Sequence, residues 1–299
     1  MTGSQGFVGG HLRRALGQRG CEVIGVDVAG RGAEIALDLA AFDADALARR
    51  VGPVAGIIHL AARISRSSSV DAAARANLRA IAEAAPLLGE AWRAAHGPTH
   101  LVLCSTLKVY GAQPSPIAPS ASPLRPEPRT YGSAKALAER LVAIAGRRAG
   151  FSTTIVRLTY VYGPGQAAHN AIPIFLDACW RGEPPVVFGD GHELRDDVLV
   201  TDVADGLAEA CLRRVEATLN AGGEGARPLR EVAALCCQAV AAAGGPTGLV
   251  PRFEIRSRCA PWHVHHPPRP GYRSGHVATS KDMQDTTRTC LRVKVSGST

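Results

Sequence analysis

Short apolar runs alternate with longer segments of helical character over most of this 299-residue chain. Four apolar runs have the length of buried strands: residues 21–28, 54–62, 100–106 and 153–161. Segments rich in Ala, Leu and Arg are expected to form helices: residues 8–19, 43–51, 71–95 and 131–149. Such alternation predicts βαβ crossovers, and hence an α/β fold with a doubly wound parallel sheet and helices on both of its faces.

The pattern changes at Ile172, after which Pro and Gly recur, strands look short and the hydrophobic periodicity weakens. We therefore expect a first domain over residues 1–171 and a small substrate-binding lobe over residues 172–250 that is interleaved with it. Residues 251–299 are expected to form an atypical basic tail without an apolar period.

The net charge of +8 lies mainly in that tail. Nine Lys/Arg against three Asp/Glu in residues 251–299 give +6, which leaves +2 for the first 250 residues. A nearly neutral body argues against a nucleic-acid partner. No stretch approaches the roughly 18 uncharged apolar residues of a membrane span, and the start lacks a basic segment followed by an apolar run. We expect a cytoplasmic protein without a membrane partner.

None of the eight cysteines forms a C-x-x-C pair, and several lie inside apolar runs, where a thiol behaves as a small hydrophobic group. We interpret them as reduced and structural, and expect no metal site. A reactive thiol is the alternative.

A glycine-rich segment at residues 2–12, TGSQGFVGGHL, places Gly3, Gly6 and Gly9 at a spacing of three before a predicted helix. Glycine lets the backbone turn tightly and approach a pyrophosphate, whose charge then lies at the helix N-terminus, beside Phe7 and Val8. These residues predict a dinucleotide site of the Rossmann type.

Asp27 ends the next apolar run, about 20 residues on, where a carboxylate can accept hydrogen bonds from both ribose hydroxyls. Because the same carboxylate would repel a 2′-phosphate, NAD is favoured over NADP, although nearby Arg31 weakens that preference. Asp38 and Leu39 are expected where the adenine would meet the following loop.

The glycine-rich segment should follow a strand that is central to this fold, yet the chain starts at Met1, directly before Thr2. We therefore expect a truncated first strand or a true start further upstream. A sheet without this strand leaves the N–H and C=O groups of its neighbours unpaired. The stability and cofactor binding of the chain as it stands would then be reduced.

Tyr131 and Lys135 in YGSAK lie one turn apart on the same face of a predicted helix. A tyrosine pKa is ordinarily near 10, and a neighbouring ammonium and a cationic nicotinamide would both lower it. Lys135 could also hold the nicotinamide ribose. Thr106 ends the run 100–106, where its hydroxyl could bind a substrate oxygen and orient it toward Tyr131. The alternatives are a surface Tyr–Lys pair and a strand-end threonine without a role.

Five ordered motifs together resemble the NAD-dependent epimerase/dehydratase family, a group of extended short-chain dehydrogenases/reductases. They are TGSQGFVG (2–9), HLAA (59–62), CSTLKVYG (104–111), YGSAK (131–135) and RLTYVYGPG (157–165). The likeness covers roughly residues 2–220. It implies that Thr106, Tyr131 and Lys135 are catalytic, that Tyr131 and Lys135 also contact the cofactor, and that Thr106 also binds the substrate.

The same resemblance implies further binding residues. Leu60, Ala61 and Ala62 would flank the adenosine side of NAD, and Asn77 would hold the neighbouring strands and the cofactor region. Asn170 and Arg195 match positions that grip a nucleotide diphosphate, for which a guanidinium offers paired donors.

Two positions depart from the family pattern. Tyr160 stands where many members that act on sugar nucleotides have asparagine, and Asp197 stands where an aromatic residue is usual. The family also implies a homodimer that pairs through the helices predicted at residues 71–95 and 131–149.

We expect an NAD-dependent epimerase that acts on a nucleotide-activated sugar through a transient keto intermediate. A dehydratase is disfavoured because Leu107 and Lys108 occupy positions where dehydratases carry Asp-Glu. An NAD(P)-dependent reductase or dehydrogenase of a sugar or another alcohol stays open, as does a non-catalytic dinucleotide-binding protein.

Overall fold

The computed structural model describes residues 1–62, 78–111, 124–126, 130–167 and 170–254. The chain divides into two compact units, which are described separately below: Met1–Val161 with Val198–Gly222, and Tyr162–Asp197 with Gly223–Thr299. The domain boundaries at residues 171 and 250 stay predictions, and most of the predicted tail lies outside the described residues.

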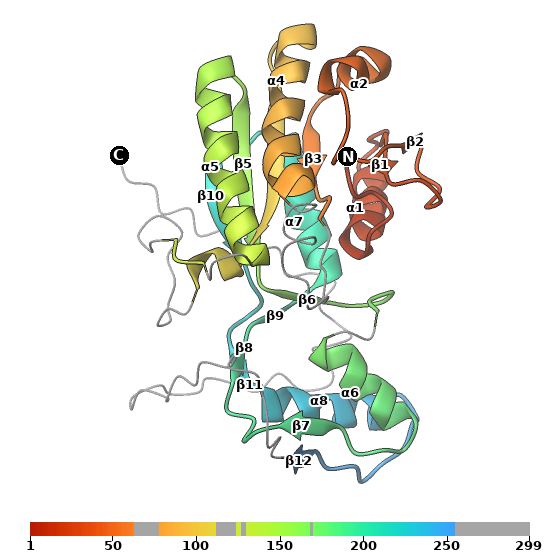
Figure 1. Cartoon of the computed structure of the whole chain (residues 1–299). Helices are drawn as coiled ribbons and strands as arrows, with labels where there is room; N and C mark the ends of the chain where they lie inside the picture. The colour runs from red at the N-terminus through yellow and green to blue at the C-terminus, as the bar shows by residue number, and fades with distance from the viewer. Residues whose placement is uncertain (63–77, 112–123, 127–129, 168–169, 255–299) are drawn as a thin grey trace. The chain divides into compact units, whose positions relative to one another are not determined.

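The first unit is built on one parallel sheet (Figure 1). Its strands are β1 (Val26–Asp27), β2 (Ile35–Ala36), β3 (Ile57–His59), β4 (His100–Thr106), β5 (Ser152–Leu158) and β10 (Ala217–Ala221). Thr2 forms parallel bridges to Val26 on one side and to His59 on the other. The spatial order is therefore β2, β1, Thr2, β3, β4, β5, β10.

Met1 and Thr2 lie where the sequence predicts a truncated central strand. The Thr2 N–H donates to the Ile58 carbonyl at 3.0 Å, and the Val26 N–H donates to the Met1 carbonyl at 2.8 Å. The terminal ammonium of Met1 donates to the Ile24 carbonyl at 2.7 Å. Two residues thus supply backbone partners to both neighbouring strands, which the sequence analysis expects to be left unpaired.

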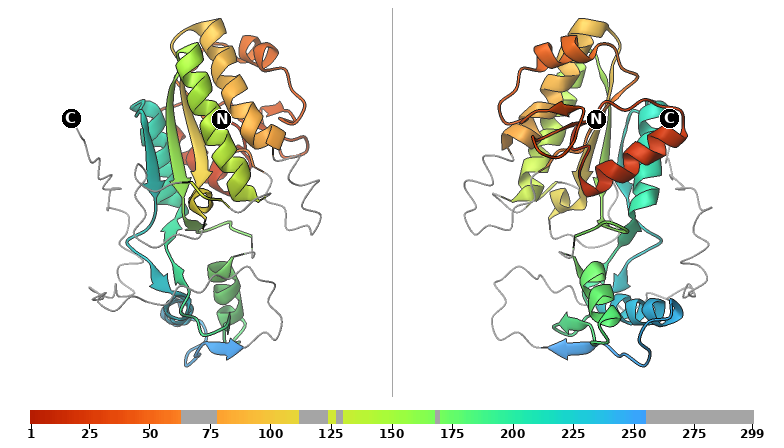
Figure 2. Two further views of the ribbon diagram at one scale, coloured as in Figure 1. Left: turned by 60° about the vertical axis from the view of Figure 1, so that its left-hand side comes forward. Right: turned by 90° about the vertical axis from the view of Figure 1, so that its right-hand side faces the viewer.

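Helices cover both faces of this sheet (Figure 2). One face carries α1 (Phe7–Gln18) and α7 (Val200–Leu212); the other carries α2 (Ala44–Val51), α4 (Ala84–His96) and α5 (Tyr131–Ala149). A π-helix, η1 (Leu78–Glu83), leads into α4, and a 3₁₀-helix, η2 (Leu107–Tyr110), follows β4.

Side chains along β4 point alternately to the two faces of the sheet, so this strand packs against both layers of helices. Leu101 and Leu103 pack into the cluster beneath α4 and α5, whereas Val102 packs into the cluster beneath α1 and α7. Successive strand residues point to opposite faces, so an uninterrupted apolar run is what a strand covered on both sides requires. The run predicted at residues 100–106 is β4 without change.

Local sequence sets both ends of α5. Thr130 and Ser133 form a reciprocal capping box at its start, and Gly150 ends it in the left-handed conformation at φ 76°. The helix predicted over residues 131–149 is confirmed.

The strand predicted over residues 21–28 is wrong in length, since only Val26–Asp27 pair as β1. The neighbour of β1 on the central side consists of Met1 and Thr2, so β1 has few backbone partners with which to extend its ladder of hydrogen bonds.

The second unit contains α6 (Ala171–Trp180) and α8 (Leu229–Ala242), which pack through Phe175, Ala233 and Cys236. Its strands are short: β7 (Val186–Phe188), β8 (Leu194–Arg195), β11 (Arg227–Pro228) and β12 (Arg252–Glu254). Two further short strands, β6 (Tyr160–Tyr162) and β9 (Asp197–Leu199), contain points where the chain passes from one unit to the other.

The six described cysteines are free thiols. Within the described residues, no group of three or more His, Cys, Asp or Glu side chains could hold a metal ion. No helix in the same part of the chain combines the length and the apolar character needed to cross a membrane.

His59 gives the fold a testable pH dependence. It is fully buried, and its Nδ1 lies 2.9 Å from the Thr2 hydroxyl. Burial first, and then the charge of Lys135, lower its pKa to about 3. The unfolded chain therefore takes up a proton below about pH 6.5 that the folded chain does not. This contribution to stability is complete above pH 6.5 and is lost as the pH falls.

We predict that the unfolding free energy falls by about 1.4 kcal/mol per pH unit below pH 6 on account of His59 alone. Urea unfolding between pH 7.5 and 5 measures this slope. His59→Asn should make the slope shallower. An identical slope in His59→Asn and the unmodified chain would contradict the assignment.

Candidate active site

Gly3 and Gly6 form a tight turn between Thr2 and α1, and Gly9 lies in the first turn of that helix. Gly3 has φ 69°, and its N–H donates to the Val26 carbonyl at 2.9 Å. A Cβ at Gly3 would lie 2.8 Å from the Ala61 nitrogen, and a Cβ at Gly9 would lie 2.3 Å from the Gly3 oxygen. Only glycine allows these approaches. The turn therefore brings the N-terminus of α1 close to the HLAA segment, as a cradle for a pyrophosphate requires.

Asp27 lies at the end of β1, next to this turn. Its Oδ2 accepts the Gln5 N–H at 2.9 Å, and its Oδ1 accepts the Val28 N–H at 2.8 Å. The Arg31 Nε lies 3.9 Å from the same carboxylate. A fixed carboxylate beside the glycine turn suits a ribose diol.

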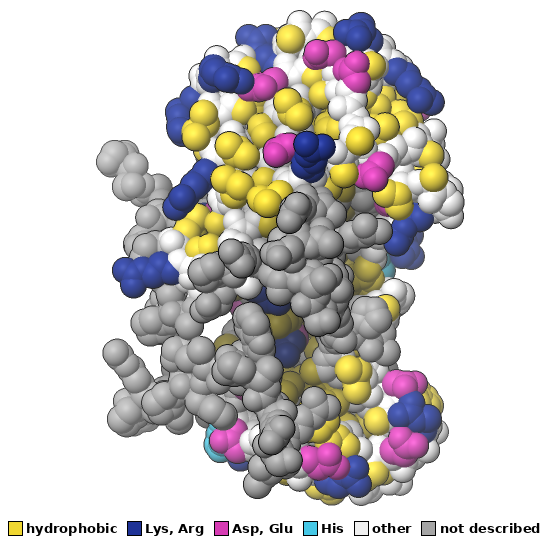
Figure 3. Space-filling model, viewed as in Figure 1, with side chains coloured by type: hydrophobic (Ala, Val, Ile, Leu, Met, Phe, Trp, Pro, Cys, Tyr) yellow, Lys and Arg dark blue, Asp and Glu magenta, His cyan; other side chains and the backbone are white. Residues whose placement is uncertain are grey.

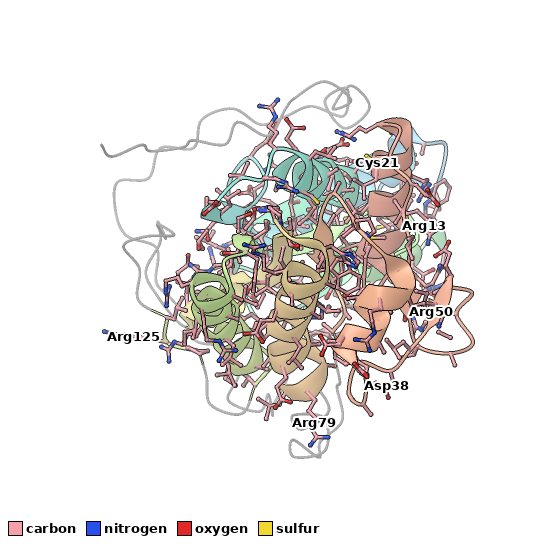
Figure 4. The ribbon with its side chains drawn as sticks, turned by 90° about the horizontal axis from the view of Figure 1, so that it is seen from above. Arg13, Cys21, Asp38, Arg50, Arg79 and Arg125 are labelled. Atoms are coloured by element: carbon pink, nitrogen blue, oxygen red, sulfur yellow. The ribbon has the colours of Figure 1, made fainter. Side chains whose placement is uncertain are left out.

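The remaining predicted cofactor residues divide into two groups. Phe7 and Val8 form the first turn of α1, while Leu60, Ala61 and Ala62 follow β3, with the Leu60 N–H bound to the Thr2 carbonyl. Asp38 (labelled in Figure 4) turns the chain after β2 by accepting the Ala40 N–H at 2.9 Å, and Leu39 beside it is buried. Asn77 lies outside the described residues. These positions fit a dinucleotide along the carboxyl ends of β1 and β3.

Thr106, Tyr131 and Lys135 gather at the carboxyl end of β4. Thr106 is its last residue, and its hydroxyl accepts the Lys108 N–H at 3.3 Å, which starts η2. Tyr131 opens α5, and the Lys135 Nζ lies 5.9 Å from the centre of its ring. Lys135 is 1% exposed and donates from Nζ to the Cys104 carbonyl at 2.7 Å.

Burial dominates the electrostatics of this group. It raises the pKa of Tyr131 above its ordinary value and lowers the pKa of Lys135. The direction for Tyr131 is opposite to the one expected from a neighbouring ammonium and a nicotinamide together. Lys135 binds the Cys104 carbonyl, and desolvation of the phenol is the largest effect on it.

A buried polar network that the sequence motifs do not reveal lies beneath the predicted catalytic residues. The Arg157 Nη2 lies 2.6 Å from the Glu139 Oε2, with side-chain exposures of 7% and 3%. The Ser105 hydroxyl donates to Glu139 at 2.5 Å, and Arg157 donates to the Tyr110 hydroxyl, also at 2.5 Å. Tyr110 in turn donates to the Asn220 Oδ1 at 2.9 Å.

This network joins the elements that carry the predicted catalytic side chains. Ser105 directly precedes Thr106, and Glu139 lies one helical turn after Lys135. Glu139 could have been noticed from its spacing of four after Lys135, and Arg157 from its place at the start of RLTYVYG. Neither signal identifies the two residues as partners.

The two predicted substrate residues belong to the second unit, whereas Thr106, Tyr131 and Lys135 belong to the first. Asn170 precedes α6 and is exposed. Arg195 lies in β8 with a side chain that is 12% exposed, and its Nη2 lies 3.9 Å from the Asp197 Oδ1. Burial raises the pKa of Asp197. The departure at Asp197 thus places an acid beside the predicted phosphate-binding arginine.

Comparison with known proteins finds relatives among NAD-dependent epimerases and related enzymes. The model of the NAD dependent epimerase/dehydratase family matches residues 1–222. A UDP-glucose 4-epimerase from Azospirillum brasilense is 32% identical over 267 residues, which cover 78% of this chain and 74% of the relative. The structure of MoeE5 in complex with UDP-glucose and NAD is 30% identical, with a TM-score of 0.72 and coverage of 86% and 84%.

The UDP-glucose 4-epimerase of Thermus thermophilus, solved as a complex with NAD, is 28% identical with a TM-score of 0.69, and the match covers 95% of this chain and 90% of that one. These matches confirm the predicted Rossmann-type α/β fold, the assignment as an enzyme and NAD as the cofactor. With the glycine turn, Asp27 and the Thr-Tyr-Lys group in place, the chain belongs to the NAD-dependent epimerase/dehydratase family.

Proposed function

We propose that this chain is an epimerase that inverts a carbinol carbon of a nucleotide-activated sugar through a transient ketone. The proposal is carried by Thr106, Tyr131 and Lys135, which gather at the end of β4 in the same unit as the glycine turn. A binding protein has no need of a tyrosine, a lysine and a strand-end threonine in this arrangement.

Each side chain has a distinct role in the proposed reaction. The Thr106 hydroxyl binds the carbinol oxygen and orients it, and Tyr131 takes the hydroxyl proton and later returns it. Because burial raises the pKa of Tyr131, the phenolate has to be stabilised by positive charge. Lys135 supplies part of that charge once its ammonium turns from the Cys104 carbonyl toward the ring. NAD, when bound, supplies the acceptor for the carbon-bound hydrogen.

The residues after Thr106 favour an epimerase over a dehydratase. Elimination of water requires additional proton transfers, and Leu107 and Lys108 offer no carboxyl group at the positions where dehydratases carry Asp-Glu. The relatives include both UDP-glucose 4-epimerases and dTDP-glucose 4,6-dehydratases, so these positions are informative.

A second candidate is an NAD(P)-dependent reductase or dehydrogenase of a sugar or another alcohol. It is favoured by Asp197, whose carboxylate lies beside Arg195 and offsets part of the charge that a diphosphate would meet there. The two candidates differ in whether the cofactor stays bound through the cycle.

The cofactor content of the purified protein tests the proposal. We expect close to one NAD per chain after denaturation, measured by mass spectrometry, and interconversion of epimers within a panel of UDP-, GDP- and dTDP-sugars without added cofactor. A folded protein that retains no NAD and turns over only with added NADH or NADPH would support the reductase instead.

We also propose a homodimer that forms through α4 and α5. Apolar side chains are exposed along both helices, among them Leu87 (44%), Leu137 (39%) and Ile144 (53%). Figure 3 shows hydrophobic side chains over this part of the first unit, between Lys and Arg side chains. Leu137 and Ile144 lie seven residues apart and therefore share one face of α5.

Replacement of Tyr131, the proposed base, tests its role in proton transfer. Tyr131→Phe should reduce kcat by at least about 100-fold, because the phenol is the group proposed to take the hydroxyl proton. The NAD content should stay unchanged, since the phenol oxygen does not belong to the glycine turn. Lys135→Met should lower both NAD content and kcat. Turnover of Tyr131→Phe within tenfold of the unmodified protein would rule out the assigned role.

The proposed dimer gives the next prediction. Ile144→Glu should weaken association at least about 100-fold, because it buries a charge in place of an apolar side chain that contributes about 1.5–3 kcal/mol. Sedimentation velocity over a concentration series measures the change. Leu212→Glu, at a residue that is 42% exposed at the end of α7, is the matched control and should not alter association. A monomeric unmodified protein, or an unaffected Ile144→Glu dimer, would contradict this interface.

A further inference from the structure

Lys108 lies next to the residues that define the sugar end of the proposed site. It is the second residue of η2, and its N–H donates to the Thr106 hydroxyl at 3.3 Å. A Cβ at Gly132 would lie 2.6 Å from the Lys108 oxygen and 3.2 Å from the Lys108 Cβ. The Lys108 side chain therefore leaves the backbone against the turn of α5 that starts with Tyr131.

Lysine is rare in this chain. Arginine outnumbers it 30 to 4, and the only lysines in the first 254 residues are Lys108 and Lys135. Both belong to the segments that carry Thr106 and Tyr131. Arginine is thus the ordinary surface cation here. Lysine differs from arginine because its compact ammonium, on a flexible four-carbon stem, acts as a movable point charge.

Lys108 has no acidic partner among the described residues. Every ion pair found in that part of the chain uses an arginine as its cation. Lys108 is exposed, whereas Lys135 is buried and bound to the Cys104 carbonyl. A cation beside a proposed catalytic group, with no carboxylate of the described residues paired to it, suits an anionic ligand.

We propose that Lys108 binds a carboxylate on the sugar ring, so that the preferred substrate is a nucleotide-activated uronic acid rather than a neutral hexose. The inference rests on the proposed function, because it requires a sugar seated between Thr106 and Tyr131. Lys108 is then a specificity residue, and the proton transfer stays with Tyr131. The diphosphate of the same substrate is a second source of negative charge, which the experiment has to separate from the ring carboxylate.

The test measures binding of UDP, UDP-glucose and UDP-glucuronic acid to the NAD-loaded full-length protein by calorimetry. We expect UDP-glucuronic acid to bind at least about tenfold more tightly than UDP-glucose, as one charge-assisted hydrogen bond provides. Lys108→Gln should remove this difference and leave UDP and UDP-glucose within about twofold of the unmodified protein.

Two further variants complete the design. Lys108→Arg keeps the charge and should retain a preference for the uronic acid, while Lys108→Glu should reverse it. Arg50→Gln removes an exposed cation at the end of α2, labelled in Figure 4, and should change none of the three affinities.

Three outcomes would overturn the inference. If Lys108→Gln weakens the binding of all three ligands equally, the Lys108 ammonium binds the diphosphate that they share. Unchanged affinities in Lys108→Gln would make Lys108 a solvated surface cation. If the unmodified protein binds none of the UDP-, GDP- and dTDP-sugars of the panel, the nucleotide-sugar function itself fails and the inference falls with it.

Discussion

The buried ion pair between Glu139 and Arg157 is the interaction on which the catalytic arrangement depends. Its geometry is fixed by Ser105 and Tyr110, which satisfy the remaining polar groups of the pair. Loss of either charged partner would leave an uncompensated charge in the core, at a cost of about 3–5 kcal/mol. Because the network spans β4, η2, α5, β5 and β10, a change at Arg157 would be felt at both Thr106 and Lys135.

The same elements show how far sequence reasoning reaches. β4 and α5 follow from local signals, since an apolar run and a capping box act over a few residues. The Glu139–Arg157 pair spans 18 residues and the Tyr110–Asn220 bond spans 110, so their partners are determined by the fold. The apolar run at residues 21–28 overestimates the length of β1 for a similar reason, because a strand extends only as far as its neighbour.

The properties of the predicted site divide in the same way, into those that local motifs reveal and those that depend on the fold. Motif spacing identifies Thr106, Tyr131 and Lys135, but the direction of the Tyr131 pKa depends on burial, which spacing does not reveal. In the proposed reaction, the phenol therefore needs stabilisation by positive charge before it can act as a base. The proposed substrate-side positions Tyr160 and Asp197 depart from the family pattern, while the glycine turn and Asp27 keep it, so chemistry and specificity are separable in the proposed function.

In the proposed reaction, one bound NAD returns the hydrogen to the molecule from which it came. A crossover experiment tests it directly, with a nucleotide sugar deuterated at the reacting carbon mixed with a ¹³C-labelled, undeuterated one. We predict that mass spectrometry finds deuterium only in epimers without ¹³C. Deuterium in the ¹³C-labelled product, or its loss to free cofactor, would contradict a recycling epimerase.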